Sequence, residues 1–236
     1  MLLLTGAPLL RWLAVADSVP FGQPRRSGCD TCGTPIGPAG PLRAVSPLAR
    51  CAGCGCRVGP PPLAVEVVLL LALAAVAAAG RPWPETAALV WFVGCAVPLF
   101  FVDVAVRRLP DRLTYAAAAG TLALFGLAAL LGGEVAAWWR ALLAGAGAAG
   151  LFALTTVLFG ARGFGLGDAK LALGAVAVLG WFGWPVVVSG LVLAFVGSGL
   201  YGLVLLAARR VAWRDHLPFG PFLILGVLGG LVLAAG

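Results

Sequence analysis

Long apolar runs separated by short polar connections repeat along most of the chain. Their lengths approach the roughly 20 residues that a helix needs to cross a bilayer. The pattern predicts helices over residues 63–80, 86–102, 113–132, 136–160, 168–184, 186–208 and 217–235. The connections between them are rich in glycine and proline, which end helices. The sequence therefore predicts an all-α polytopic membrane protein.

The first sixty residues follow a different pattern. Residues 1–20 are apolar but interrupted by Pro8, Arg11 and Asp17, which predicts a weak first transmembrane segment. They lack the basic start and the cleavage site of a secretory signal, so we expect the segment to be retained. Residues 21–61 are polar and show no periodic apolar pattern, so we expect something other than a hydrophobic core to order them. With a membrane domain of seven helices at 62–236, the chain would contain about seven to eight transmembrane helices.

Composition and charge agree with this class. Of 236 residues, 61% are hydrophobic and 11% are charged, and the mean hydropathy of +1.04 excludes an ordinary soluble domain. The net charge of +7 comes from arginines in short loops between apolar runs, a signal of membrane topology that gives no reason to expect a nucleic-acid partner. Most of these arginines fall on the side of the cysteine-rich segment. We therefore expect that side to be cytoplasmic and the lipid bilayer to surround the helices.

Two acids stand at the boundaries of apolar runs. Asp168 follows a glycine-dense loop in the stretch Gly165-Leu166-Gly167-Asp168, and Asp103 closes an earlier run. On the predicted topology both reach the cytoplasmic face, where an acid is costly unless it has a partner or a function. Two adjacent carboxyls cannot easily both ionise, so the pair would share a proton near neutral pH. One carboxylate would then activate a water while the protonated partner polarises a carbonyl, which is aspartyl protease chemistry.

Three alternatives compete with this interpretation. The acids could be helix caps or ion-pair partners of Arg107, Arg108 and Lys170. The chain could instead be a small transporter that uses Asp103 and Asp168 as a proton relay, although such acids tend to lie near the bilayer midplane in broken helices. A catalytically silent assembly factor is the third alternative.

Five of the six cysteines fall in the polar segment. Cys29-x2-Cys32 and Cys51-x2-Cys54 are separated by 18 residues, a spacing typical of a zinc site. Four thiolates would give a closed, structural site, without which a short segment with no core would be disordered. Cys56 is a fifth candidate that could replace Cys54, and unligated thiols are the alternative to any metal site.

Three separate motifs resemble those of the type IV leader peptidases, also called prepilin peptidases. They are Asp103 followed by Leu109-Pro110-Asp111 and Leu113-Thr114, the glycine motif 165–168, and Pro218-Phe219-Gly220-Pro221. The similarity covers about residues 25–236 and includes the cysteine segment, which presenilin-like proteases with the same glycine motif lack. The resemblance implies a membrane aspartyl endopeptidase that removes the leader of type IV prepilins or pseudopilins after a glycine at the cytoplasmic face. It makes Asp103 and Asp168 the catalytic pair.

The remaining expected site residues surround that pair or match the family. Contacts with the substrate are expected from the following residues: Gly165, Gly167, Asp111, Lys170 and Glu66. Glycines would let an extended substrate backbone approach closely, whereas Asp111 and Glu66 could equally be a loop cap and a helix N-terminal acid. The family's cytoplasmic segment is associated with N-methylation of the new amino terminus. We expect S-adenosylmethionine as a cofactor only if that activity is retained, because the stretch that usually precedes the cysteines is not recognisable.

Overall fold

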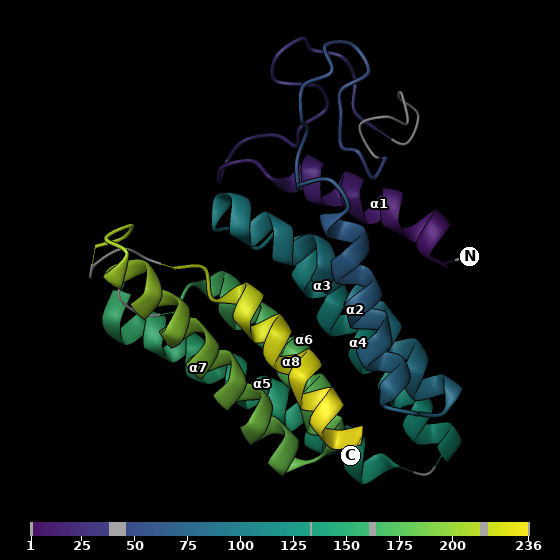
Figure 1. Cartoon of the computed structure of the whole chain (residues 1–236). Coiled ribbons are helices and arrows are strands. Elements are labelled where there is room, and N and C mark those ends of the chain that lie inside the picture. Colours follow the sequence, from purple (N-terminus) through teal and green to yellow (C-terminus); the bar gives the residue numbers. More distant parts are fainter. Residues whose placement is uncertain (1, 38–45, 133, 161–163, 213–216, 236) are drawn as a thin grey trace.

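The computed structural model describes residues 2–37, 46–132, 134–160, 164–212 and 217–235, and eight helices lie in these ranges. They are α1 (Leu2–Asp17), α2 (Ala64–Ala78), α3 (Trp83–Val106), α4 (Asp111–Gly132), α5 (Val135–Phe159), α6 (Leu166–Phe182), α7 (Trp184–Ala207) and α8 (Gly220–Ala235). Figure 1 shows them as one bundle with the cysteine-rich segment at one end. Within the described residues the only β pairing is two isolated bridges. The predicted all-α class is confirmed.

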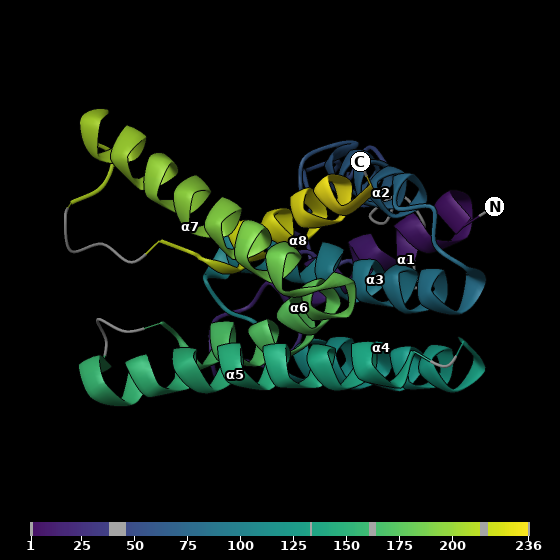
Figure 2. The same cartoon turned by 90° about the horizontal axis from the view of Figure 1, so that it is seen from below.

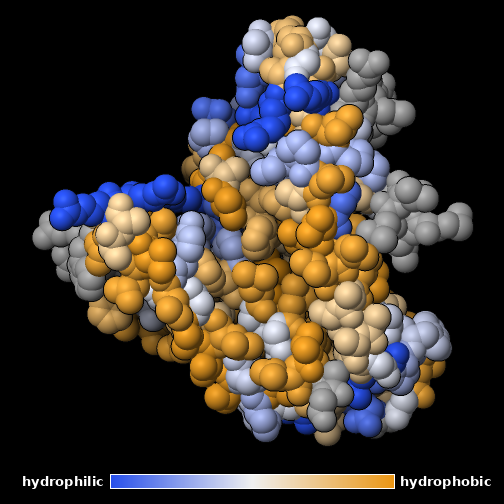
Figure 3. Space-filling view, in the orientation of Figure 1, coloured by the Kyte–Doolittle hydropathy of each residue, from blue (hydrophilic) through white to orange (hydrophobic). Residues whose placement is uncertain are grey.

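Four helices are long and apolar enough to cross a membrane: α3, α4, α5 and α7. Helices α2 and α8 are apolar but shorter. Figure 3 shows apolar side chains covering the body of the bundle, with hydrophilic residues gathered at its two ends. A surface of this kind is stable against lipid rather than water. The protein is therefore a membrane protein, while the exact number of spans stays a prediction.

Helix α6 lies at the centre of the bundle and is buried along most of its length. Small residues let its neighbours approach closely. A Cβ atom on Gly174 would lie 3.0 Å from Cα of Ala118 in α4, and one on Gly180 would lie 2.9 Å from Cα of Ala141 in α5. These contacts fix the height and rotation of α6, and therefore the position of the acid in its first turn.

The ends of α3 and α6 differ from the predicted ones in a way that matters for the site. Helix α3 continues to Val106, so Asp103 lies inside its last turn. The helix ends because Arg107 is left-handed (φ 52°), with its N–H donating to the carbonyl of Asp103 at 2.8 Å. Helix α6 begins at Leu166, so Asp168 lies in its first turn. Both acids are thus held by helical backbone rather than by loops.

Helix α1 lies across the end of the bundle that carries the cysteine-rich segment (Figure 1). Its Arg11 is fully buried, donates to the carbonyl of Pro60 at 3.1 Å and pairs with Glu66 at 2.6 Å. The expectation that no hydrophobic core orders residues 21–61 was wrong. Side chains from α1 and from this segment form a small buried cluster: Val15, Cys29, Ile36, Cys51 and Val58. The sequence pattern did not predict this cluster, because its members come from separate segments of the chain.

Asp17, at the end of α1, joins the cysteine-rich segment to the membrane helices. Its buried carboxylate accepts a hydrogen bond from Arg25 at 3.1 Å and another from Arg112 in the first turn of α4. Arg108 donates to the carbonyls of Val19 and Pro20 at 3.3 and 3.2 Å. These contacts hold residues 17–25 against the loop that follows Asp103.

We expect Asp17→Ala to release this contact, because it leaves two arginines without their shared acceptor. The loss of stability should be about 1–3 kcal/mol, less than for a fully buried ion pair because both arginines are partly exposed. Limited proteolysis between residues 17 and 25, together with thermal unfolding in detergent, would measure it. Asp30→Ala is the matched control, since Asp30 pairs with Arg26 on the surface at 2.9 Å. Equal behaviour of the two variants would contradict the docking role of Asp17.

Candidate active site and metal centre

Asp103 is a buried acid without a neutralising partner. Its residue is 4% exposed, and its Oδ2 atom has no hydrogen-bond partner within the described residues. A buried, unsatisfied carboxylate oxygen is costly to a fold and is tolerated mainly where it has a function. Asp103 is therefore the residue around which the site is built.

Asp168 faces the same space from α6. It lies in the first turn of that helix, where the helix dipole favours negative charge. Both acids line the same two cavities, although they come from different helices. No ion pair in the described part of the chain involves either acid: Lys170 pairs with Asp111 at 2.7 Å, and Arg108 binds backbone carbonyls. The alternative that Asp103 and Asp168 are ion-pair partners of neighbouring basic residues therefore finds no support among the described residues.

Leu109 brings the three sequence motifs together. It is buried between two glycines, one from each of the other motifs. A Cβ atom on Gly167 would lie 3.2 Å from Cβ of Leu109, and one on Gly220 would lie 3.4 Å from its Cδ1. The Cβ on Gly220 would also lie 2.7 Å from Oδ2 of Asp103, closer than real atoms pack. Glycine at position 220 is thus required by the space that the carboxylate occupies.

Gly220→Ala should lower the catalytic rate without lowering stability. The new methyl group would displace the Asp103 carboxylate, and misplacing a reacting group by about 1 Å can cost about 10²-fold in rate. Alanine also favours helix over glycine, so the fold should not suffer at this first residue of α8. The measurement is turnover of a substrate peptide alongside the unfolding temperature, with Gly147→Ala as the control because a Cβ there meets nothing within 4 Å. Unchanged turnover in Gly220→Ala would contradict this account of the site.

Phe164 fixes the loop that precedes Asp168. Its ring stacks on Phe152 of α5 with centroids 4.4 Å apart and meets the edge of Phe219 at 5.0 Å. Its carbonyl accepts a hydrogen bond from the hydroxyl of Thr156. Because Phe219 directly precedes Gly220, these contacts tie the loop before Asp168 to the segment that covers Asp103. The separation of the two acids is set by packing on both sides.

Two cavities meet at the acids. The first, the polar cavity, has a volume of about 670 Å³, is lined mainly by charged residues and lies between residues 17–25 and residues 107–112. The second, of about 990 Å³, is lined by α5, α7 and residues 217–219. Asp103, Arg107, Gly165 and Asp168 line both. The two acids therefore lie where the two cavities join.

The structure brings most, but not all, of the predicted site residues together. Gly165, Gly167, Asp111 and Lys170 line the polar cavity beside the two acids. Glu66 lines neither cavity and pairs with Arg11 instead. Sequence reasoning missed the following residues: Asp17, Leu109, Arg112, Phe164 and Phe219. The motifs contain or adjoin four of these five, but nothing in the pattern assigned a contact to any of them.

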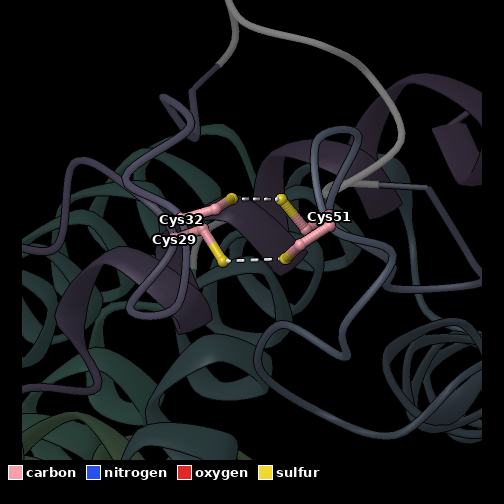
Figure 4. A group of neighbouring side chains, drawn as sticks. Cys29, Cys32 and Cys51 are labelled. Carbon is pink, nitrogen blue, oxygen red and sulfur yellow. Dashed lines mark hydrogen bonds between the residues drawn. The ribbon is translucent and has the colours of Figure 1, made fainter.

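The four predicted cysteine ligands converge in the cysteine-rich segment. The sulfur atoms of Cys29, Cys32, Cys51 and Cys54 all lie within 4.8 Å of one another. Figure 4 shows Cys29 and Cys32 facing Cys51 across the gap between two turns. Tetrahedral zinc with bonds of about 2.3 Å needs sulfurs roughly 3.8 Å apart, and the pairs Cys29–Cys54 and Cys32–Cys51 lie at 3.8 and 3.5 Å. The group has the donors and the geometry to hold a metal ion.

The two cysteine turns are built alike. In each, the first cysteine accepts a hydrogen bond from a left-handed glycine, Gly33 at 2.8 Å and Gly55 at 3.1 Å. Each also donates to the residue five positions on, Thr34 at 2.9 Å and Cys56 at 2.8 Å. Cys56 is thus the counterpart of Thr34, which is no metal ligand.

Side-chain contacts repeat the same correspondence. The sulfur of Cys54 lies 3.0 Å from that of Cys56, and the sulfur of Cys32 lies 3.1 Å from the hydroxyl of Thr34. Backbone N–H groups of Thr31 and Cys32 lower the pKa of the Cys29 thiol to about 6, because they stabilise the thiolate. The sulfur of Cys56 lies 3.4 Å from that of Cys29, but it is Cys54 that completes the set of four sulfurs lying within 4.8 Å of one another.

The fold and site define a class, a helical membrane protein with two acids that line the same cavities and a segment of four cysteines that could hold a metal ion. Comparison with known proteins gives the family. The model of the type IV leader peptidase family matches residues 87–234. The chain therefore belongs to the type IV leader peptidase family, and it is an enzyme of the peptidase class.

Curated relatives agree with this assignment. A prepilin leader peptidase/N-methyltransferase of Aeromonas hydrophila is 35% identical over 219 residues, which cover 89% of this chain and 72% of the relative. The protein of the same name from Burkholderia pseudomallei (strain 1026b) is 35% identical over 85% of this chain and 65% of its own. The Pseudomonas aeruginosa protein is 30% identical over 89% of this chain and 71% of its own. No solved structure matches the chain.

Proposed function

We propose that this protein is an aspartyl endopeptidase that removes the leader peptide of type IV prepilins or pseudopilins. The cut would follow a glycine at the cytoplasmic membrane face. The observation that carries the proposal is the buried carboxylate of Asp103, whose Oδ2 atom has no hydrogen-bond partner within the described residues, in the two cavities that Asp168 also lines. The names of the relatives supply the substrate class.

In this mechanism Asp103 and Asp168 share one proton. The ionised carboxylate takes a proton from a water molecule, and the water oxygen attacks the carbonyl carbon of the scissile bond. The protonated carboxyl donates to the carbonyl oxygen, and the amide nitrogen leaves after accepting a proton. Gly165 and Gly167 present backbone without side chains to the substrate chain, which allows it to approach the acids closely.

The transporter alternative receives less support from the position of the acids. Relay acids lie in broken helices near the midplane of the bilayer. Asp103 lies in the last turn of α3 and Asp168 in the first turn of α6, and both helices are continuous beyond these turns. Acids at helix ends suit hydrolysis at a membrane boundary, and a transporter would cleave no prepilin.

We propose that the four cysteines hold a structural zinc ion in the cytoplasmic segment. Their thiolates would supply all four ligands, which leaves no open position for a substrate or water. None of the four lines either cavity at the acids. The ion would stabilise the two turns that α1 and Asp17 hold against the membrane helices.

N-methylation of the new amino terminus is the second activity to test. The names of the relatives include it, and S-adenosylmethionine would be its methyl donor. We propose no site for this cofactor.

The test is leader removal in membranes. The protein is co-expressed with a type IV prepilin, and mass spectrometry of the pilin amino terminus identifies the cleaved bond. We expect cleavage after the glycine that precedes the apolar helix, and an added methyl mass if the second activity is retained. Intact prepilin across several pilin types, with folded enzyme in the membrane, would overturn the proposal.

A further inference from the structure

We propose that the cavity between α5 and α7, the α5–α7 groove, receives the apolar helix that follows the scissile bond of the substrate. This inference rests on the proposed function and specifies the orientation in which the substrate binds. The leader would lie in the polar cavity and the apolar segment would enter the groove from the side of the bundle.

The groove follows from how the two helices pack. Helices α5 and α7 touch through Phe152 and Phe195, whose ring centroids are 6.2 Å apart. From there they diverge toward Phe159 and Ala207, as Figure 2 shows at the left of the view. The cavity of about 990 Å³ lies between the diverging ends. It opens beside the acids, so a helix lying in it would end at the catalytic pair.

The lining of the groove fits a helix. On α7 it consists of Ser198, Gly199 and Gly202, which carry almost no side chain. A Cβ atom on Gly199 would meet nothing within 4 Å. Small residues in a membrane allow another helix to approach closely, and their backbones become part of the contact surface. Phe159 lines the opposite wall from α5.

Charge separates the two cavities. In the described lining of the groove, the charged residues are Asp103, Asp168 and Arg107, all at the acid pair. The polar cavity has six further charged residues. Two lie in residues 17–25, one on the loop after Asp103, two in the first turn of α4 and one in the first half of α6: Asp17, Arg25, Arg108, Asp111, Arg112 and Lys170. A charged leader would stay hydrated in the polar cavity, whereas an apolar helix would lose no hydration in the groove. On these grounds we place the leader in the polar cavity and the apolar helix in the groove.

The test fills the groove without touching the acids. Gly199→Leu places a side chain in open space within the groove, and Gly147→Leu does the same on α5, at an exposed position that lines neither cavity. Each variant is assayed with a full-length prepilin and with a short peptide that ends a few residues after the scissile glycine. We expect Gly199→Leu to lower the ratio of full-length to short-peptide cleavage roughly tenfold, because the leucine side chain would occupy space that the substrate helix needs. Gly147→Leu should leave that ratio as in wild type.

Two results would overturn the inference, and a third would overturn the proposed function on which it rests. An unchanged ratio in Gly199→Leu would mean that the substrate helix does not use the groove and that lipid fills it. Equal loss of both substrates would mean that the substitution acts on the acid pair. Cleavage of neither substrate by wild type would instead refute the proposed function itself, before any variant is compared.

Cross-linking tests the occupant directly. A photoreactive benzoylphenylalanine at position 199, in an enzyme that also carries Asp168→Asn, is irradiated with full-length prepilin in membranes. We expect a cross-link to the apolar segment of the prepilin and none from position 147. A cross-link from position 199 only to a second copy of the enzyme would assign the groove to self-association and overturn the proposal.

Discussion

Replacing Asp103 or Asp168 by asparagine is expected to lower prepilin cleavage by about 10³-fold or more, the range that general acid–base groups contribute. Asparagine keeps the shape of the side chain but can neither take a proton from water nor share one with its neighbour. Either change alone should suffice, because the two carboxyls act as one unit. The measurement is the rate of leader loss in membranes, followed by mass spectrometry.

Asp103→Asn should leave the stability of the fold unchanged or raise it. Oδ2 of Asp103 is buried without a partner in the described chain, so Asp103→Asn removes the cost of burying a charge there. We expect an unfolding temperature equal to or above that of wild type, which separates lost chemistry from lost folding. Glu134→Gln is the control, because Glu134 is exposed at the start of α5 and lines neither cavity. Cleavage that persists in either asparagine variant would remove that acid from the mechanism.

Removing a metal ligand should have the second-largest effect. Cys54→Ser takes one thiolate from the proposed zinc site, and we expect the purified protein to lose most of its bound zinc and the segment 21–61 to become sensitive to protease. Only a small apolar cluster would remain to hold the two cysteine turns. Metal content by mass spectrometry and limited proteolysis measure the two effects.

Cys56→Ser is the matched comparison. Because Cys56 occupies the place of Thr34 in the repeated turn, a hydroxyl there should be tolerated, and we expect zinc content to stay within about 20% of wild type. Loss of zinc in Cys56→Ser with retention in Cys54→Ser would reverse the ligand assignment. If the zinc-free protein resisted protease as well as the zinc-loaded protein does, a structural role for the metal would be contradicted.

The predicted helices were confirmed because their signal is local. Apolar runs bounded by glycine and proline gave helices α2 to α8 with ends shifted by a few residues. These shifts change the predicted position of a site residue where the end of a helix depends on backbone conformation and not on residue type. Arg107 adopts a left-handed conformation that nothing in its side chain predicts, and it leaves Asp103 inside α3.

The site was less accessible to sequence reasoning. The spacing of motifs places both acids near one face, and their catalytic role stays a prediction. The contact of Leu109 with Gly167 and Gly220 depends on three segments meeting, and no single motif encodes it. Glu66 shows the opposite case. Its place at the start of a helix suggested a site residue, but in the structure it pairs with the buried Arg11 of α1.

The sequence by itself therefore determined the class, the helices, the cysteine turns and the acids that stand at helix ends, because hydrophobic length, turn chemistry and ligand spacing are properties of short stretches. Only the tertiary structure decided that Oδ2 of Asp103 is buried without a hydrogen-bond partner among the described residues, that Asp17 joins residues 17–25 to α4, and that α5 and α7 diverge beside the acids. These features arise from packing between segments far apart in the chain, where the shape of one surface decides what the other can hold.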